Sequence, residues 1–344
     1  MRKKELLALA MCGQFSPLRP LSRFMRNENL TVLAYHRINE KPDDSYPHQE
    51  DTVSTTSDMF RSQLAFLKRY CFVTTFKGLA ELIAANEKIP PNTVIITFDD
   101  GYRDNYDIAL PILSEFKLPA VIYVVTGNID TGQPFWFDIL SYALTNAPNG
   151  TLRVLDGRHT FDISNGNGKL LRRSFGDLVR VLTDQERVQA ISELVDYSKC
   201  RDEIEAHERM VLTWPEVSEL HSAGIEIGSH TVSHPFLSCL SDEQLESELV
   251  ESKRRIETEI GSPVVSLSYP TGGKSFYDER ALKFAATCGY QFAVSYEHNA
   301  LPYSHDARFD IPRIHIELDV CQALFEAYTM MPGLFLRSFG SATV

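Results

Sequence analysis

Thr97-Phe98-Asp99-Asp100-Gly101 directly follows the apolar run Val94-Ile95-Ile96, and this order indicates a buried strand that ends in two acidic residues. A second apolar segment, Gly224-Ile225-Glu226-Ile227-Gly228, leads into Ser229-His230-Thr231-Val232-Ser233-His234-Pro235. Both polar clusters follow strand-like segments, where barrel enzymes keep their catalytic groups. One carboxylate and two imidazoles would make a three-ligand metal site with an open position, and the second carboxylate would remain for proton transfer.

The segments around these clusters alternate between strands and helices. Residues 30–35 and 94–98 read as strands, 109–116 as a helix, and 120–125 as another buried strand. This order predicts an α/β fold with a parallel sheet and crossover helices. The alternation is interrupted between residues 128 and 209, which we interpret as a mainly helical insertion at about 130–210. It resumes with strands at 225–227, 264–269, 292–295 and 311–316.

Charge and cysteine content exclude several classes of protein. The chain has 344 residues and a net charge of −12, so a nucleic-acid partner is not expected and broad electrostatic adhesion to anionic membranes is unfavourable. Six scattered cysteines with no CxxC pair suit reduced thiols in a cytoplasmic protein.

The first 29 residues allow two interpretations. Met1-Arg2-Lys3-Lys4 is basic and Leu6 to Cys12 is apolar, as in a short signal peptide, but no A-x-A-like site follows and Arg19, Arg23 and Arg26 come soon after. A basic amphipathic helix on the protein or on a membrane surface fits as well. We therefore expect a cytoplasmic protein, and peripheral membrane contact through this segment and export both stay alternatives.

At the two motifs the chain resembles the polysaccharide deacetylase superfamily, carbohydrate esterase family 4, which carries the NodB homology domain. T-F-D-D-G and S-H-T-x-x-H-P are both present, in this order, and each follows an apolar strand. Tyr35-His36-Arg37 and Trp136-Phe137-Asp138 also look like elements of bacterial members with a long N-terminal part. The resemblance implies a distorted (β/α) barrel of about seven strands with its site at the carboxyl ends of the strands.

The resemblance assigns roles to the four motif residues. Asp100, His230 and His234 would hold one divalent metal ion, zinc by resemblance, although imidazole and carboxylate ligands suit iron, cobalt or nickel alike. Asp99 would be the general base, because a metal lowers the pKa of the water it holds to about 7 and a nearby carboxylate can take the proton. Both aspartates reach one site only if the chain turns irregularly, which Gly101 permits.

The chain departs from the family pattern in two places. The third family motif, R-x-P-Y-G, reads Ser268-Tyr269-Pro270-Thr271-Gly272 and lacks the arginine that orients the catalytic aspartate. We expect Arg313 to pair with Asp99 in its place, with a surface or structural ion pair as the alternative. The late L-x-H motif has no copy, and His315 is the substitute that we expect as general acid, unless it only belongs to a half-buried strand.

Three further residues are expected to bind substrate: His36 at the end of the first strand, Tyr269 through its backbone or ring, and Trp136 by stacking on a sugar. Each could instead be structural. The resemblance implies hydrolysis of N-acetyl groups on amino sugars of a glycan. A deformylase or imide amidohydrolase acting on a small substrate and an inactive glycan-binding module stay open.

The expected organisation has four parts. Residues 1–29 form a basic and apolar helix, 30–91 the N-terminal part of the catalytic domain, 92–320 the deacetylase domain with its insertion, and 321–344 a C-terminal tail. The oligomeric state is not predicted.

Overall fold

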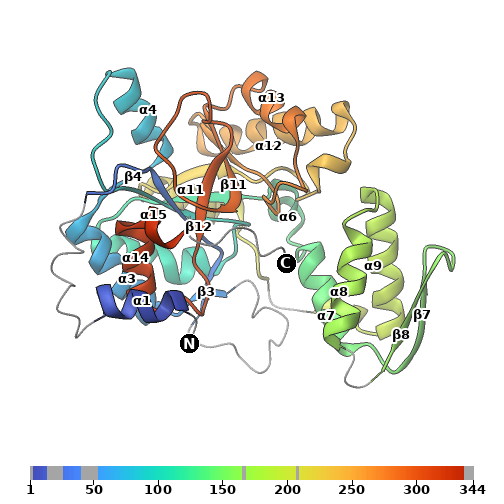
Figure 1. Cartoon of the computed structure of the whole chain (residues 1–344). Coiled ribbons are helices and arrows are strands. Elements are labelled where there is room, and N and C mark those ends of the chain that lie inside the picture. The colour runs from blue at the N-terminus through green and yellow to red at the C-terminus, as the bar shows by residue number, and fades with distance from the viewer. Residues whose placement is uncertain (1–2, 14–25, 40–52, 165–167, 207–208, 337–344) are drawn as a thin grey trace.

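A closed barrel of seven parallel strands forms the body of the computed structural model, which describes residues 3–13, 26–39, 53–164, 168–206 and 209–336 (Figure 1). Neighbouring strands follow the order β1, β12, β11, β10, β9, β6, β5, and β5 pairs with β1 to close the ring. Their bounds are Thr31–Tyr35, Ile311–His315, Phe292–His298, Ser266–Ser268, Glu226–Ser229, Val121–Val124 and Thr93–Phe98. The predicted barrel is confirmed.

The barrel is distorted where an eighth strand joins it. β4 (Phe72–Thr74) pairs with the first half of β5, and β6 pairs with the second half. Two short strands, β2 (Arg37–Ile38) and β3 (Val53–Thr55), pair with each other after the end of β1.

Alternating side chains divide the apolar residues of the barrel into two layers. Val32, Ile95 and Val121 belong to one buried cluster, and their neighbours Leu33, Ile96 and Ile122 belong to another that includes side chains of the surrounding helices. Thr97 and Asp99 continue the side of Ile95, so the interior becomes polar toward the carboxyl end of β5. The site therefore lies at the end of the barrel that the sequence predicted.

Helices surround the strands. These are α3 (Ser57–Tyr70), α4 (Phe76–Ala84), α5 (Leu110–Phe116) with a π-helical turn before it at Asn105–Ala109, α6 (Thr126–Thr131), α11 (Trp214–Ser222), α12 (Asp242–Ile260) and α13 (Glu279–Thr287). A 3-10 turn, Leu237–Cys239, precedes α12, whose capping box joins Ser241 to Gln244 and whose end at Gly261 has φ +62°. Among the described residues, no helix combines the length and apolar character needed to cross a bilayer.

The insertion forms a lobe with an apolar core of its own (Figure 1). It contains α7 (Trp136–Asn146), the hairpin of β7 (Gly150–Val154) and β8 (His159–Ile163), and the helices α8 (Gly168–Val179), α9 (Asp184–Ser198) and α10 (Arg201–Glu205). Its buried side chains run from Leu140 to Cys200, within the expected 130–210 range.

The C-terminal segment is not the tail that we expected over 321–344. Its described part, up to residue 336, forms α14 (Gln322–Met330) and α15 (Pro332–Phe335), and side chains such as Phe325 and Phe335 are buried in the core around the barrel. At the other end of the chain, α1 (Lys3–Cys12) packs against α14, which also contacts α3.

Candidate active site

The two aspartates at the end of β5 point into one site because the backbone takes left-handed, positive φ angles directly after Asp99. Asp100 has φ +74° and Gly101 has φ +78°, whereas a regular strand would send adjacent side chains to opposite faces. A Cβ on Gly101 would lie 3.1 Å from Val124 Cγ1, so neither the angle nor the space suits a larger residue. The irregular turn that the sequence predicted is present.

The two histidines meet Asp100 from the end of β9. His230 Nε2 lies 3.3 Å and His234 Nε2 lies 3.6 Å from Asp100 Oδ1, and the three side chains are almost fully buried. One ligand atom from each of the three residues lies within 4.8 Å of the others. The predicted ligand set is therefore brought together.

This ligand set fits a divalent cation. The Ser268 carbonyl oxygen lies 2.7 Å from His230 Nδ1, so this nitrogen can donate to it and Nε2 is the atom that would bind a cation. Burial and the neighbouring His230 lower the pKa of His234 to about 3, so His234 is neutral, the form that binds metal. Its Nδ1 is buried and accepts or donates no hydrogen bond within the described part of the chain. Two imidazoles and one carboxylate match a catalytic metal site with an open position.

Asp99 is held by a bidentate ion pair inside the barrel. Arg313 Nη1 and Nη2 donate to Asp99 Oδ1 and Oδ2 over 2.7 and 2.6 Å, and Arg313 is fully buried. Burial alone would raise the pKa of Asp99, but the charges of Arg313 and His230 bring this pKa well below its usual range. The expected pair is present, and Asp99 is ionised at neutral pH. Its part in catalysis stays a prediction.

Small polar residues make room for Arg313. Its Nε donates to the Ser295 carbonyl, and its guanidinium donates to Thr97 Oγ1 (3.1 Å) and Ser268 Oγ (2.9 Å). Ser268 stands at the start of the incomplete third motif. A strand-borne arginine from β12 thus occupies the position next to Asp99 that the missing family arginine would serve.

The loop between the two histidines is clamped by Glu248 of α12. Glu248 Oε2 accepts from the backbone N–H groups of Val232 (2.7 Å) and Ser233 (3.0 Å), and Oε1 accepts from Ser233 Oγ (2.7 Å). Thr231 and His234 flank this contact with φ of +70° and +55°. Such angles cost about 1–3 kcal/mol each in non-glycine residues and persist only where neighbours fix them.

Glu248→Gln is expected to weaken metal binding while leaving the fold intact. The amide replaces one acceptor by an NH₂ group that faces donors, so the loop carrying His234 loosens. Loss of such outer contacts costs about 10–100-fold in metal affinity, which a competition titration with a chromophoric chelator measures. Glu251→Gln is the matched control, because Glu251 is exposed and pairs with Arg254. An affinity of Glu248→Gln within twofold of the control would contradict this role.

His36 lies beside both aspartates, where β1 ends. It is half-buried, its charge interacts with Asp99 and with Asp100, and the edge of its ring meets Tyr296 at 5.4 Å between centroids. The structure places His36 near both aspartates, and its contact with substrate stays a prediction.

His315 is unsuited to the role of general acid that we expected. Its ring lies flat on Tyr296 with centroids 3.5 Å apart, and its Nε2 donates to the Tyr296 carbonyl over 2.9 Å. Burial and the neighbouring His298 and Arg313 lower the pKa of His315 to about 2. An imidazole that is neutral at neutral pH and already donates its proton to the backbone cannot protonate a leaving amine.

Tyr269 does not reach the substrate either. Its side chain is fully buried and stacks on Tyr277 with centroids 4.5 Å apart, and its hydroxyl donates to the Phe309 carbonyl over 2.8 Å. Its backbone N–H donates to the Val294 carbonyl. The expected substrate contact through the backbone or ring of Tyr269 is therefore wrong.

Trp136 of the insertion supports the metal loop. Its Nε1 donates to the His234 carbonyl over 3.1 Å, and the Arg187 guanidinium lies 4.8 Å from its ring centroid. Trp136 is half-buried, and Arg187 covers part of its ring. The structure places Trp136 next to the site, and its stacking on a sugar stays a prediction.

Sequence reasoning missed three residues of the site. Tyr296 joins His36 to His315, and Glu248 holds the histidine loop. Asp138, two residues after Trp136, accepts from the Tyr102 hydroxyl over 3.0 Å, and burial raises its pKa to about 7. The Trp136-Phe137-Asp138 motif was the one available signal for Asp138, whereas Tyr296 and Glu248 belong to no motif.

Comparison with known proteins points to one family. A family model described as polysaccharide deacetylase matches residues 86–293, more than half of the chain. Bacillus subtilis YxkH, whose own name places it among the polysaccharide deacetylases, is 23% identical over 300 residues, which cover 87% of this chain and 75% of that protein.

Two further matches are more distant or shorter. The poly-β-1,6-N-acetyl-D-glucosamine N-deacetylase of Staphylococcus aureus is 27% identical over 140 residues, 39% of this chain and about half (48%) of that protein. Among solved structures, the Streptococcus pyogenes deacetylase PplD in complex with acetate has a TM-score of 0.60 at 19% identity and covers 88% of this chain and 99% of that one. The structural match supports the fold.

Proposed function

The chain belongs to the polysaccharide deacetylase family, hydrolases of carbon–nitrogen bonds other than peptide bonds, and we propose that it removes N-acetyl groups from amino sugars of a glycan with the help of a divalent metal. The observation that carries this proposal is the convergence of Asp99, Asp100, His230 and His234 at the carboxyl end of the barrel. The name of the staphylococcal relative favours a polymer of N-acetylglucosamine as the substrate class.

Asp100, His230 and His234 would hold the metal. When bound, a divalent cation supplies Lewis-acid chemistry, because it polarises a carbonyl oxygen and lowers the pKa of water. His230 keeps its Nε2 available because its Nδ1 is engaged by the Ser268 carbonyl. Glu248 and Trp136 both hold the backbone of the loop that carries His234.

Asp99 accepts the proton of the attacking water. Each carboxylate oxygen has two lone pairs, and the described contacts of Oδ1 use one of them, for Arg313. Arg313 keeps the carboxylate ionised and fixes its plane, so the base is present in its active form across neutral pH.

His36 donates the proton to the leaving amine. It is half-buried and interacts electrostatically with both aspartates. Its ring meets Tyr296 edge-on, whereas the ring of His315 is stacked flat on Tyr296. The reaction consumes one water and forms one acetate and one free amine.

His36→Gln is expected to lower kcat on soluble N-acetylglucosamine oligomers by about 10²–10⁴, because general-acid catalysis contributes that much. Acetate release measures kcat, and metal content should stay within twofold of the wild type. His315→Gln is the matched control and should retain most of the turnover. The reverse pattern would return the general acid to His315.

The same assay tests the proposed reaction. Wild-type protein should release acetate from N-acetylated oligomers and leave N-formylated amines and cyclic imides untouched. Hydrolysis of the small substrates without acetate release would instead favour a non-glycan amidohydrolase. Metal-loaded protein that binds oligomers without any turnover would favour a glycan-binding module.

A further inference from the structure

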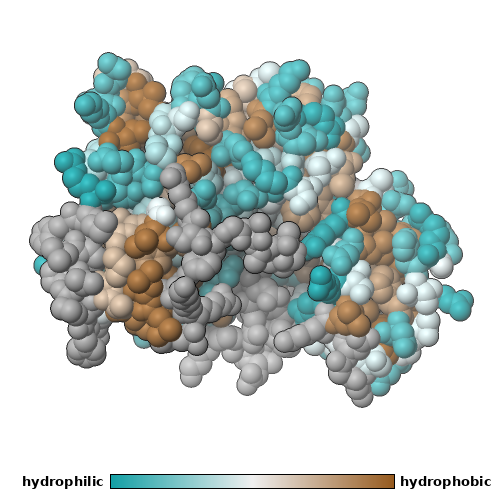
Figure 2. All heavy atoms as spheres, viewed as in Figure 1, coloured by the Kyte–Doolittle hydropathy of each residue, from teal (hydrophilic) through white to brown (hydrophobic). Residues whose placement is uncertain are grey.

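The helix α1 shows the reverse of the usual distribution of side chains on a helix packed against a core. It buries small residues, Ala8 and Cys12, against the body of the protein. Met11 is half-buried and packs against the same core, whereas Leu6, Leu7 and Leu9 are exposed by 53%, 43% and 40%. Figure 2 shows brown, apolar side chains gathered where α1 lies in Figure 1. A helix serving only to cover the core would bury its leucines.

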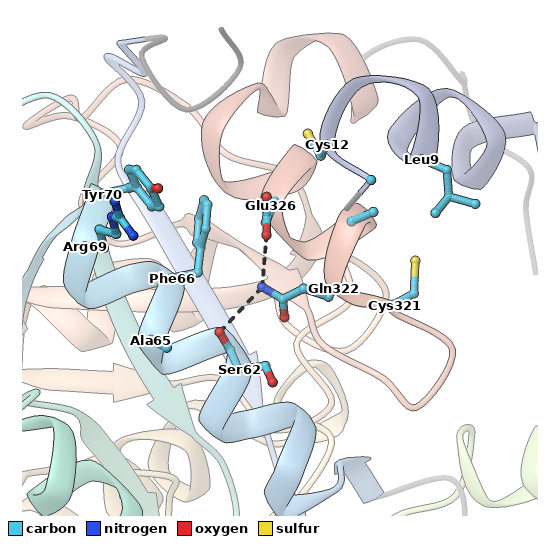
Figure 3. A pocket seen from close by; sticks show the side chains of 12 residues that line it. Leu9, Cys12, Ser62, Ala65, Phe66, Arg69, Tyr70, Cys321, Gln322 and Glu326 are labelled. Carbon is cyan, nitrogen blue, oxygen red and sulfur yellow. Dashed lines mark hydrogen bonds between the residues drawn. The ribbon is translucent and has the colours of Figure 1, made fainter. Parts of the chain in front are cut away.

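The contact beneath α1 is also incomplete. A pocket of about 590 Å³ lies between α1, α3 and α14 (Figure 3). Leu9 and Cys12 border it from α1, and Ser62 and Phe66 border it from α3. Gln322 of α14 bridges this space through Nε2, which donates to the Ser62 carbonyl and to Glu326 Oε1. Leu6 and Leu7 do not border this pocket, so they are not needed to seat the helix, and their exposure calls for an external partner.

The charge of this part of the chain differs from that of the rest. Of the 34 Lys and Arg residues, six fall within the first 29 positions, against two of the 46 Asp and Glu residues. Arg2, Lys3 and Lys4 precede the leucines in sequence, and Arg26 follows the helix with an exposed side chain. A locally basic segment with exposed leucines complements a surface that is both apolar and anionic.

We infer that α1 docks the protein to anionic membranes by placing Leu6 and Leu7, with Leu9 at the edge of the contact, into the boundary between headgroups and acyl chains. A second copy of the chain is a poorer partner, because a two-fold interface brings the same patch together and would oppose the two basic segments. Acidic lipids offer the opposite charge. This inference does not depend on the metal site or on the proposed reaction.

Vesicle flotation tests this docking with the full chain. Wild-type protein should float with vesicles of phosphatidylcholine and phosphatidylglycerol in equal parts, bind pure phosphatidylcholine more weakly, and lose affinity in 0.5 M NaCl because salt screens the attraction. Leu6→Gln, Leu7→Gln and Leu9→Gln combined should lower the partition coefficient at least tenfold. Glutamine is close to leucine in helix propensity, so α1 should persist.

The matched control removes three exposed apolar residues from the insertion lobe instead. Leu170, Val181 and Val188 are exposed by 61%, 76% and 59%, and their combined replacement by Gln should leave vesicle binding unchanged. Equal loss in both triple variants would overturn the inference, as would wild-type protein that does not float. Dimers that form without vesicles and disperse in the α1 variant, with no lipid binding, would assign the surface to a second copy. Acetate release from soluble oligomers reads out the proposed reaction separately.

Discussion

Replacing Arg313 by Met is expected to lower the free energy of unfolding by about 3–5 kcal/mol, because it leaves the Asp99 carboxylate buried without its partner. Arg313 is fully buried, and its two shortest hydrogen bonds, of 2.7 and 2.6 Å, go to the carboxylate of Asp99. Urea denaturation followed by circular dichroism measures the change. Turnover should fall as well, since Asp99 would no longer be held in its plane or kept ionised.

The double variant Asp99→Asn/Arg313→Met is the control for this effect. Removing both charges should recover a large part of the stability that Arg313→Met loses, because the penalty comes from one uncompensated charge. A loss below about 1 kcal/mol in Arg313→Met would contradict a buried pair that depends on its partner.

The pair also fixes the pH dependence of stability. Because the pKa of Asp99 is lower in the folded than in the unfolded chain, the pair stabilises the fold fully above about pH 4, the ordinary range for an unfolded aspartate. This contribution is lost as the pH falls from there toward the lowered pKa. Arg313→Met should therefore show less acid sensitivity from this pair than the wild type.

Asp99→Asn is expected to lower kcat by about 10²–10⁴ while the metal stays bound. The amide keeps the size of the side chain and can still accept a hydrogen bond from Arg313, but it cannot take a proton from water. Metal content and acetate release, measured on the same preparation, separate this loss from a loss of the cation.

Asp104→Asn is the matched control for Asp99→Asn. Asp104 is also a buried aspartate paired with an arginine, Arg37, at 2.6 Å. Its carboxylate is not part of the group around the candidate metal site. Turnover of Asp104→Asn should stay within about fivefold of the wild type if the variant folds. Similar losses in both variants would mean that Asp99 acts through structure rather than as the base.

The sequence predicted the barrel, and the convergence of Asp99, Asp100, His230 and His234 at its end, because both leave local signals. Apolar runs followed at once by Asp-Asp-Gly or by two spaced histidines identify strand ends, and the turn at Asp100 and Gly101 was implied by two adjacent acids serving one site. The pair of Arg313 with Asp99 could be expected only because the third family motif lacks its arginine in this chain, so another cation had to be sought for Asp99.

The remaining roles depend on packing between distant segments, which a sequence pattern does not reveal. His315 lies between Ile314 and Ile316, in the alternation that the sequence showed. Its ring is nevertheless stacked on Tyr296, and burial and the charge of His298 lower its pKa. Tyr269 stands in a motif, but Tyr277 covers its ring. Residues 321–344 were expected to be a tail, whereas the described part of this segment, up to residue 336, forms helices that contact α1 and α3, far away in sequence.

The three-ligand metal site is tested by the metal content of purified wild-type protein and of His230→Ala, determined by elemental mass spectrometry. His230 offers its Nε2 to the same point as Asp100 and His234, so we expect about one divalent metal per wild-type chain and none in the variant. Circular dichroism should show that the variant is folded. Wild-type protein that is metal-free and takes up no added zinc, cobalt or nickel would rule out the metal site.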